Sequence, residues 1–428
     1  MLSVLNRYLP DVKDSDMDYN EFVFDYIASS FKRRYLKNAV IRKKLVCCFT
    51  RFGRPCGIVL RGYVFCVLSA EYCVRTGTVL IDKGYPTMYN ENGKTTEDLE
   101  RMKIAVIGSG SFGTAIAAQL ARKGYTVALW SYLAQEAQTL HNTRQNPLLP
   151  GVFLDESVLC TADMAQACQY ADLIVTVVPS FATRSTAKAL APYMKDRQPL
   201  VNLSKGLENG SLLRLSQVYA QELPMCRIAV MSGPSHAEEV GIGLPTTNVV
   251  ASADEALAAY VQDIFMHETF RVYLSNDPVG VELGGALKNV IALCAGISDG
   301  LGYGDNTKAA LMTRGIAEIK RLGVAMGGKA ETFAGLSGIG DLIVTCTSMH
   351  SRNRRCGILL GQGKTLQQAM EEVQMVVEGV PTTQAAYALA EKYDVCMPIV
   401  GQAYAVLFEN KNSRDAVHAL MTRNKTAE

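Results

Sequence analysis

The chain has 428 residues, 48% of them hydrophobic, and its 43 Lys and Arg nearly balance its 41 Asp and Glu. That length predicts two or three domains, each able to bury its own core. The near-neutral balance argues against a general nucleic-acid-binding protein, but it leaves room for a local basic cluster that binds an anionic small molecule. We find no run of about 18 apolar residues, so we expect no membrane-spanning helix and no stable membrane insertion.

Residues 1–101 differ from the rest and form an atypical, basic, Cys-rich extension. Their basic residues run from Lys32 to Arg61 without an intervening acid, and an apolar stretch, Tyr63–Val74, follows without sustained helical or strand periodicity. Early acids such as Asp11 argue against a transit peptide, and the missing apolar core argues against a signal peptide. The basic stretch could contact anionic lipid or nucleic acid. The interpretation we favour is that the extension is not a folded module and that Met102 is the natural start.

Twelve cysteines are scattered along the chain, with no Cys-x-x-Cys pair and no spacing typical of zinc. Cysteines in apolar segments behave as small core residues. We therefore expect reduced thiols, a cytoplasmic location and no metal site.

A dinucleotide-binding fingerprint opens the second part of the chain. A short apolar strand, Lys103–Ile107, meets Gly-x-Gly-x-x-Gly at Gly108, Gly110 and Gly113, and a helical pattern follows to about residue 123. The first glycine allows a tight turn, the second lets the backbone approach a pyrophosphate, and the third lets helix pack on strand. The helix N-terminus would face the phosphates.

Strands and helices then alternate, which predicts an α/β, Rossmann-type, doubly wound parallel sheet. Further strands are expected at Thr126–Trp130, Leu173–Val177, Leu200–Asn202, Ile228–Ser232 and Thr247–Ser252. After about Val279 only helical patterns remain. We therefore predict a dinucleotide-binding domain at 102–279, an all-helical substrate-binding and catalytic domain at 280–428, and a substrate site in the cleft between them.

The second strand ends at Trp130-Ser131-Tyr132, without the acid that usually binds the ribose of NAD. This ending permits NADP without proving it, so NAD and NADP both stay open as the cofactor. Arg144 could reach a 2′-phosphate, or it could be a solvated surface residue.

Several later residues could carry chemistry. Lys205 ends a strand at the sheet's carboxyl edge, and Gly233 and Ser235 follow the next strand. Lys288 stands mid-helix, and small residues on the preceding turn, Gly284 and Gly285, would leave space for a ligand beside it. A lysine in such a pocket can have a lowered pKa and transfer protons.

A loop-rich basic cluster runs from Gly338 to Arg355. Within it, Asp341 could orient Lys288, Arg352 offers bidentate donors to a phosphate, and Ser351 and Asn353 add neutral donors. His236 is more consistent with a structural role at a helix start than with acid–base chemistry.

Together these blocks resemble bacterial NAD(P)-dependent glycerol-3-phosphate dehydrogenase, over about Met102 to Met421. The resemblance rests on Gly108–Gly113, Val178–Ser180, Lys205–Glu208, Ser232–Pro234, Gly284–Asn289, Gly340–Leu342, Ser351–Arg355 and Val376–Gly379. It implies reversible reduction of dihydroxyacetone phosphate by NADPH or NADH to sn-glycerol 3-phosphate, which supplies phospholipid synthesis, and a cytoplasmic homodimer.

The resemblance also implies roles for individual residues. Lys288 would be the proton donor and acceptor, with Lys205 and Asp341 beside it in the catalytic group. The substrate would be lined by Lys205, Gly233, Ser235, Lys288, Asp341, Ser351, Arg352 and Asn353. The cofactor would be lined by Gly108, Gly110, Ser111, Phe112, Gly113, Tyr132, Lys205, Ala237, Arg352, Val376 and Glu378.

Two alternatives stay open at this point. A β-hydroxyacid or 6-phosphogluconate type of dehydrogenase would use the Ser-Arg-Asn cluster for a carboxylate. A nucleotide-redox sensor would bind NADPH without turnover, although the presence of both Lys205 and Lys288 argues against it.

Overall fold

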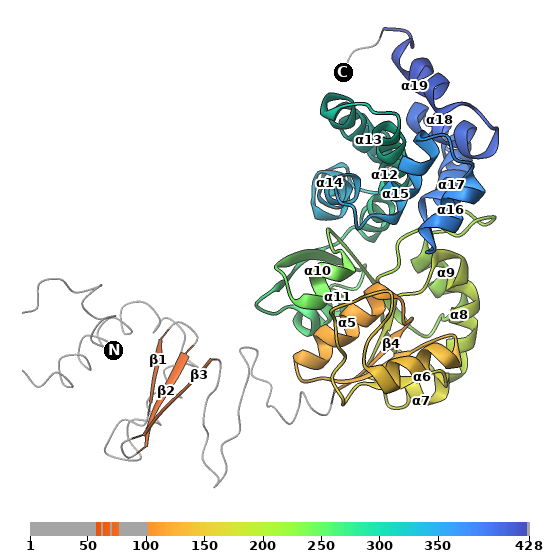
Figure 1. Cartoon of the computed structure of the whole chain (residues 1–428). Coiled ribbons are helices and arrows are strands. Elements are labelled where there is room, and N and C mark those ends of the chain that lie inside the picture. Colours follow the sequence, from red (N-terminus) through yellow and green to blue (C-terminus); the bar gives the residue numbers. More distant parts are fainter. Residues whose placement is uncertain (1–56, 61–62, 69–70, 77–101, 426–428) are drawn as a thin grey trace, which may run out of the picture. The chain divides into compact units, whose positions relative to one another are not determined.

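The computed structural model describes residues 102–425 and, before them, only the backbone of 57–60, 63–68 and 71–76 (Figure 1). The chain divides into two compact units, Met1–Thr95 and Thr96–Glu428. In the first unit, β1 (Gly57–Leu60), β2 (Tyr63–Leu68) and β3 (Glu71–Thr76) form an antiparallel sheet in the order β1-β2-β3. The stretch Tyr63–Val74, where no strand periodicity was expected, is therefore largely extended. The basic cluster Lys32–Arg61 lies almost wholly outside the described residues, and the nature of the extension stays a prediction.

The second unit is built on an eight-stranded sheet in the order β11-β10-β9-β8-β7-β4-β5-β6. The strands are β4 (Lys103–Ile107), β5 (Thr126–Trp130), β6 (Leu159–Thr161), β7 (Leu173–Thr176), β8 (Pro199–Asn202), β9 (Arg227–Ser232), β10 (Thr246–Ala251) and β11 (Phe270–Ser275). The chain leaves β4 in one direction through β5 and β6 and returns to β7 on the other side. The carboxyl ends of β4 and β7 thus form the switch point at which such sheets bind ligands.

The sheet confirms the doubly wound fold but is not wholly parallel. The β9–β10 pair is antiparallel, with Val249 opposite Ser232, whereas the other pairs in this sheet are parallel. Between β9 and β10 the chain makes only the six-residue helix α10 (Ala237–Ile242). The chain re-enters the sheet at the same end at which it left β9, so β10 runs antiparallel to β9. Two strands, β6 and β11, were not predicted.

Helices cover the sheet on both sides, as Figure 1 shows for α5, α11, α6 and α8. Beside α10 they are α5 (Ser111–Arg122), α6 (Ala134–Thr143), α7 (Met164–Cys168), α8 (Thr183–Leu190), α9 (Leu215–Glu222) and α11 (Glu255–Phe265). Two apolar clusters lie against the sheet, one including Ile116, Leu129 and Phe265 and the other Ile107, Ile174 and Tyr219. We call residues 103–275 the sheet part.

The remaining residues form the helical part, centred on α12 (Pro278–Gly300). Around it lie α13 (Asp305–Ala325), α14 (Asp341–Thr347), α15 (Arg352–Gly361), α16 (Leu366–Val373), α17 (Gly379–Lys392), α18 (Pro398–Phe408) and α19 (Ser413–Met421). By length and composition α12 could cross a bilayer, but 94% of its apolar window is buried inside the protein, as in a core helix. The region expected to be loop-rich, 338–355, is instead mostly helical. The division into domains at residue 279 stays a prediction, because both parts belong to one compact unit.

Close backbone contact fixes α15 against α12. A Cβ on Gly296 would lie 2.0 Å from the Arg354 carbonyl oxygen, and one on Gly357 would lie 2.0 Å from that of Leu293. Only glycines allow the helices to approach so closely. This packing brings the N-terminus of α15 to the middle of α12, where Lys288 lies.

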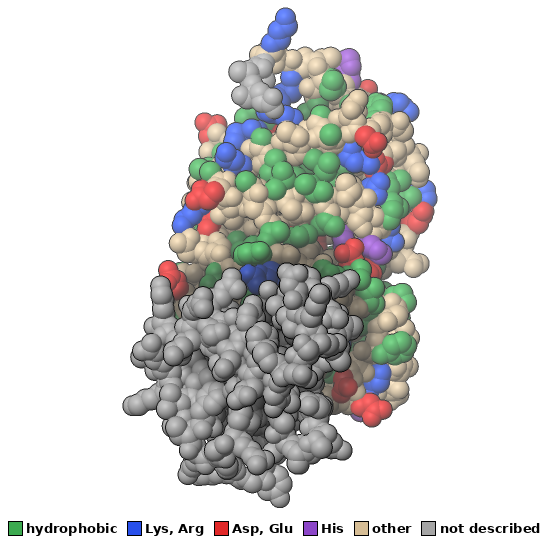
Figure 2. All heavy atoms as spheres, turned by 90° about the vertical axis from the view of Figure 1, so that its left-hand side faces the viewer, with side chains coloured by type: hydrophobic (Ala, Val, Ile, Leu, Met, Phe, Trp, Pro, Cys, Tyr) green, Lys and Arg blue, Asp and Glu red, His purple; other side chains and the backbone are tan. Residues whose placement is uncertain are grey.

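The surface carries charges of both signs, in line with the near-neutral composition, and the described cysteines are unpaired. Figure 2 shows charges of both signs interspersed with apolar side chains over the helical part. The seven cysteines among residues 102–425 are all free thiols. Over the same residues, no group of three or more His, Cys, Asp and Glu side chains could hold a metal ion.

Candidate active site

The glycine loop after β4 has the geometry expected of a phosphate cradle. Gly108 has a φ of +119°, and a Cβ there would lie 2.5 Å from the Val177 carbonyl oxygen. A Cβ on Gly113 would lie 1.9 Å from the Gly108 carbonyl oxygen, whereas Gly110 has open space around it. The tight turn, the open approach and the close helix–strand packing therefore fall on the three glycines as predicted. The open Gly110 backbone and the N-terminus of α5 fit a pyrophosphate.

Four more of the residues expected at the cofactor follow the carboxyl ends of strands in this sheet. Ser111 begins α5 and donates its hydroxyl to the Leu148 carbonyl at 2.9 Å, and Phe112 packs against the sheet core. Tyr132 is 83% exposed and makes an edge contact with Trp130. Ala237 begins α10. These residues come from three different connections, which follow β4, β5 and β9 at one end of the sheet.

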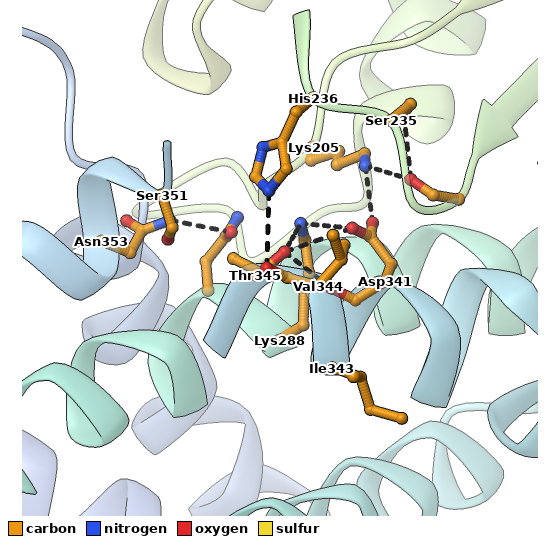
Figure 3. Close-up of polar contacts among 12 residues, drawn as sticks. Lys205, Ser235, His236, Lys288, Asp341, Ile343, Val344, Thr345, Ser351 and Asn353 are labelled. Atoms are coloured by element: carbon orange, nitrogen blue, oxygen red, sulfur yellow. Dashed lines mark hydrogen bonds and ion pairs between the residues drawn. The ribbon is translucent and has the colours of Figure 1, made fainter. Parts of the chain in front are cut away.

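A buried carboxylate between two lysines forms the centre of the site (Figure 3). Asp341 is 1% exposed, and its Oδ1 accepts from Lys288 Nζ at 2.6 Å while its Oδ2 accepts from Lys205 Nζ at 2.5 Å. Lys288 Nζ also donates to Thr345 Oγ1 at 2.6 Å, and Lys205 Nζ donates to the Gly233 carbonyl at 2.9 Å. Asp341 thus contacts Lys288 directly, as the expectation that it orients this lysine requires, and it contacts Lys205 as well.

The electrostatics of this group depress the basicity of Lys288. Burial, with a further contribution from the positive charge of Lys205, lowers the pKa of Lys288 to about 8, although Asp341 opposes this shift. The pKa of Asp341 is below its usual range, because the two ammonium groups outweigh its burial. Lys288 is therefore an ammonium that can lose its proton near neutral pH.

The two glycines that precede Lys288 serve a purpose other than the expected one. A Cβ on Gly284 would lie 2.5 Å from the Ser337 carbonyl oxygen, and one on Gly285 would lie 2.5 Å from Ser232 Oγ. Protein atoms thus fill the space that was expected to hold a ligand. Gly284 lets the π-helical turn η4 (Leu336–Gly340) pack on α12, and that turn leads directly into Asp341.

Arg352 differs from Ser351 and Asn353 in its contacts. Its half-buried guanidinium makes no hydrogen bond or ion pair within residues 102–425, and burial lowers its pKa. Ser351 is the N-cap of α15, and its hydroxyl accepts from the Arg354 backbone N–H. Asn353 donates to Asn289 Oδ1 at 2.9 Å and accepts from the Gly379 N–H at 2.8 Å. Arg352 is the member of this cluster left free for an anion.

Glu378 connects the two parts of the unit. Its carboxylate accepts from the Ser180 backbone N–H at 2.9 Å and from the Ser180 hydroxyl at 2.5 Å, and burial raises its pKa. Val376 lies half-buried two residues before it. Ser180 follows β7 at the switch point, so Glu378 reaches from the helical part to the cofactor edge of the sheet.

Two residues that lie within the predicted motifs were given no role from the sequence. Thr345 contacts Lys288, and Asn289 holds the amide of Asn353. The spacing of Thr345 from Asp341 is a one-turn helical spacing, but the segment was expected to be a loop. His236 is the N-cap residue of α10, and its Nε2 lies 3.4 Å from the Val344 carbonyl oxygen. Its structural role stays a prediction.

A Rossmann-type sheet, an open glycine loop at its switch point and a buried lysine pair beside it define a dinucleotide-dependent dehydrogenase. Comparison with known proteins gives the particular family. The models for the N-terminus and the C-terminus of NAD-dependent glycerol-3-phosphate dehydrogenase match residues 103–258 and 277–418. The chain belongs to the NAD(P)-dependent glycerol-3-phosphate dehydrogenase family.

Individual relatives agree with this assignment. The glycerol-3-phosphate dehydrogenase [NAD(P)+] of Moorella thermoacetica is 58% identical over 326 residues, which cover 76% of this chain and 97% of that protein. The protein of the same name from Fusobacterium nucleatum is 54% identical over 330 residues, 76% of this chain and 98% of that protein. The crystal structure of glycerol-3-phosphate dehydrogenase from Coxiella burnetii has a TM-score of 0.74 and 38% identity, and the match covers 76% of this chain and 100% of that one.

Proposed function

We propose that this chain catalyses the reversible NAD(P)H-dependent reduction of dihydroxyacetone phosphate to sn-glycerol 3-phosphate. Two relatives with the name of that enzyme are 54% and 58% identical in sequence to this chain over the matched residues. The observation that carries the proposal is the buried Lys288 ammonium, held by Asp341 and Thr345 at 2.6 Å and 2.6 Å.

Lys288 is the proton donor to the ketone oxygen and, in the reverse direction, the acceptor from the hydroxyl. When bound, NAD(P)H supplies the hydride for the carbonyl carbon. As negative charge develops on the oxygen, a positioned ammonium both stabilises it and protonates it. A lysine whose pKa is about 8 suits both directions, because each protonation state is accessible near neutral pH.

Asp341 and Lys205 are assigned to the same reaction. Asp341 holds both ammonium groups in place, and Lys205 adds positive charge where the sheet edge meets the substrate. Gly233, Ser235, Ser351 and Asn353 would line the substrate with these residues. Arg352 would bind the phosphate, since a guanidinium matches phosphate geometry and this one has no hydrogen-bond or ion-pair partner among residues 102–425. Binding the phosphate places the distant carbonyl for reaction.

The cofactor would lie along the carboxyl edge of the sheet. Its pyrophosphate fits the backbone of Gly108, Gly110 and Gly113 and the N-terminus of α5. The remaining residues that we assign to the cofactor are Ser111, Phe112, Tyr132, Lys205, Ala237, Arg352, Val376 and Glu378. We further propose a cytoplasmic homodimer without membrane insertion, whose product supplies phospholipid synthesis.

The test is NADPH oxidation, and separately NADH oxidation, by the full-length protein with dihydroxyacetone phosphate. We expect turnover with the wild type and a loss of about 10²- to 10⁴-fold in kcat for Lys288→Ala, the range for general acid catalysis. Lys308→Ala, which removes a lysine paired with Asp299 near the far end of α12, is the matched control. Near-normal turnover of Lys288→Ala would remove Lys288 from the mechanism, and no oxidation by the folded wild type would refute the reaction.

A further inference from the structure

An acidic side chain that the proposed mechanism does not use lies at the adenosine end of the dinucleotide site. Glu136 Oε2 accepts from the Ser131 hydroxyl at 2.8 Å and from the Ser109 hydroxyl at 3.3 Å. The two hydroxyls are themselves 2.8 Å apart, and both serines are buried. Glu136 itself is exposed. Its carboxylate is therefore fixed in position and still accessible to a ligand.

The position of this carboxylate in the fold points to a role in cofactor binding. Ser109 belongs to the glycine loop after β4, and Ser131 follows β5 directly. The two strand ends are adjacent, because Ile107 pairs with Trp130 and the Gly108 N–H donates to the Trp130 carbonyl at 3.0 Å. In a Rossmann domain an acid that ends this second strand binds the ribose hydroxyls of NAD. The strand of this chain ends without an acid, and Glu136 reaches back from the first turn of α6 to the same point.

Within residues 102–425 Glu136 has no ion pair. Arg144, the candidate partner for a 2′-phosphate, instead donates to the Val158 carbonyl at 2.8 Å. A 2′-phosphate brought to the end of β5 would thus meet a carboxylate, and a like charge is how a site rejects an otherwise similar ligand.

We propose that Glu136 is the residue that selects NAD(H) over NADP(H), by accepting from the adenosine ribose hydroxyls and repelling a 2′-phosphate. This proposal rests on the proposed function, since it concerns the cofactor of that reaction. A purely structural role would need only an acceptor for two serine hydroxyls and an acid near a helix N-terminus. Glu136→Gln separates the two, because the amide oxygen still accepts while the charge is lost.

The chain carries its own reporter of binding. Its single tryptophan, Trp130, is the last residue of β5. A reduced nicotinamide bound on this domain should quench its emission, so dissociation constants for NADH and NADPH can be measured without turnover. The control is Glu156→Gln, which changes net charge equally: this exposed acid precedes the amino-terminal end of β6, whereas Glu136 lies by the carboxyl end of the neighbouring strand β5.

We expect the full-length wild type to bind NADH at least about tenfold more tightly than NADPH. In Glu136→Gln that ratio should fall by about tenfold or more, chiefly through tighter NADPH binding, and in Glu156→Gln it should stay within about twofold. A wild type that prefers NADPH, or a ratio that Glu136→Gln leaves unchanged, would overturn the proposal while leaving the reaction intact. Binding of neither dinucleotide would refute the proposed function together with this inference.

A second measurement uses the wild type alone, so it does not depend on whether a variant folds. ADP and its 2′-phosphorylated counterpart carry the adenosine end alone, and each can be tested for displacing NADH from the wild type. We expect ADP to compete better. If the 2′-phosphorylated compound competes as well or better, Glu136 does not select the cofactor.

Discussion

The substitution Asp341→Asn tests how the site sets the proton affinity of Lys288. In the native protein, burial and the Lys205 charge lower the pKa of Lys288 to about 8, and Asp341, 2.6 Å away, is the main group that raises it. An opposite charge this close shifts a pKa by about 1 to 3. With asparagine in its place, the pKa of Lys288 should fall from about 8 to about 6.

The two reaction directions should respond to this change in opposite ways. Ketone reduction needs the ammonium, so the pH at which its kcat falls should drop by about two in the variant. Alcohol oxidation needs the neutral amine, so the pH at which its kcat rises should drop by the same amount. A loss of orientation alone would reduce both rates without moving either midpoint. The midpoint is therefore the informative quantity.

The assay is kcat against pH in both directions for the full-length protein. Asp299→Asn is the matched control, because Asp299 likewise pairs with two basic partners, Arg354 and Lys308, but lies near the C-terminal end of α12, eleven residues after Lys288. At a rise of about 1.5 Å per residue, this position is about 16 Å along α12 from Lys288. Midpoints that stay near 8 in Asp341→Asn, or that move upward, would refute the assignment of Lys288 as the titrating acid.

Two further predictions concern the substrate and the stability of the protein. Arg352→Ala should raise KM for dihydroxyacetone phosphate about 10- to 100-fold, the value of one or two charged hydrogen bonds, with a smaller change in kcat; an unchanged KM would exclude Arg352 from phosphate binding. Glu318 is 2% exposed on α13, and burial raises its pKa to about 7 from 4.5, although it accepts from the Ile399 and Val400 N–H groups. The native state thus holds a proton that the unfolded chain releases between about pH 4.5 and 7, so stability should fall as pH rises through that window. In Glu318→Gln this part of the slope of Tm against pH should vanish, and an unaltered slope would contradict the raised pKa.

The sequence predicted those features that a local pattern encodes. Each of the six expected strands lies within a residue or two of an observed one, because each is a short apolar run bounded by turn residues. The roles of Gly108 and Gly113 follow from a motif whose chemistry is backbone geometry. The Lys288–Asp341 contact was expected from the position of Asp341 in the basic cluster, and its directness depends on η4 packing against Gly284.

What escaped prediction depends on tertiary contacts. β6 has only three residues, and β11 alternates buried and exposed positions at the sheet edge, so neither shows a strong apolar run. The direction of β10 depends on where the connection re-enters the sheet. Glu136 was not identified because its carboxylate reaches the end of β5 from the next helix, five residues later. A pattern that looks for an acid on the strand itself cannot find it.

The arrangement of charge explains why one aspartate serves two lysines. Asp341 forms one ion pair with Lys205 of the sheet part and another with Lys288 of α12, so a single carboxylate joins the two parts of the unit. Two ammonium groups and one carboxylate leave one net positive charge in a buried site. A second carboxylate would neutralise that charge and raise the pKa of Lys288, whereas none would leave two repelling ammonium groups without a partner. Two lysines around one carboxylate therefore leave a positive charge that can stabilise a developing oxyanion. The same arrangement keeps the pKa of Lys288 low enough for its neutral amine to act as a base.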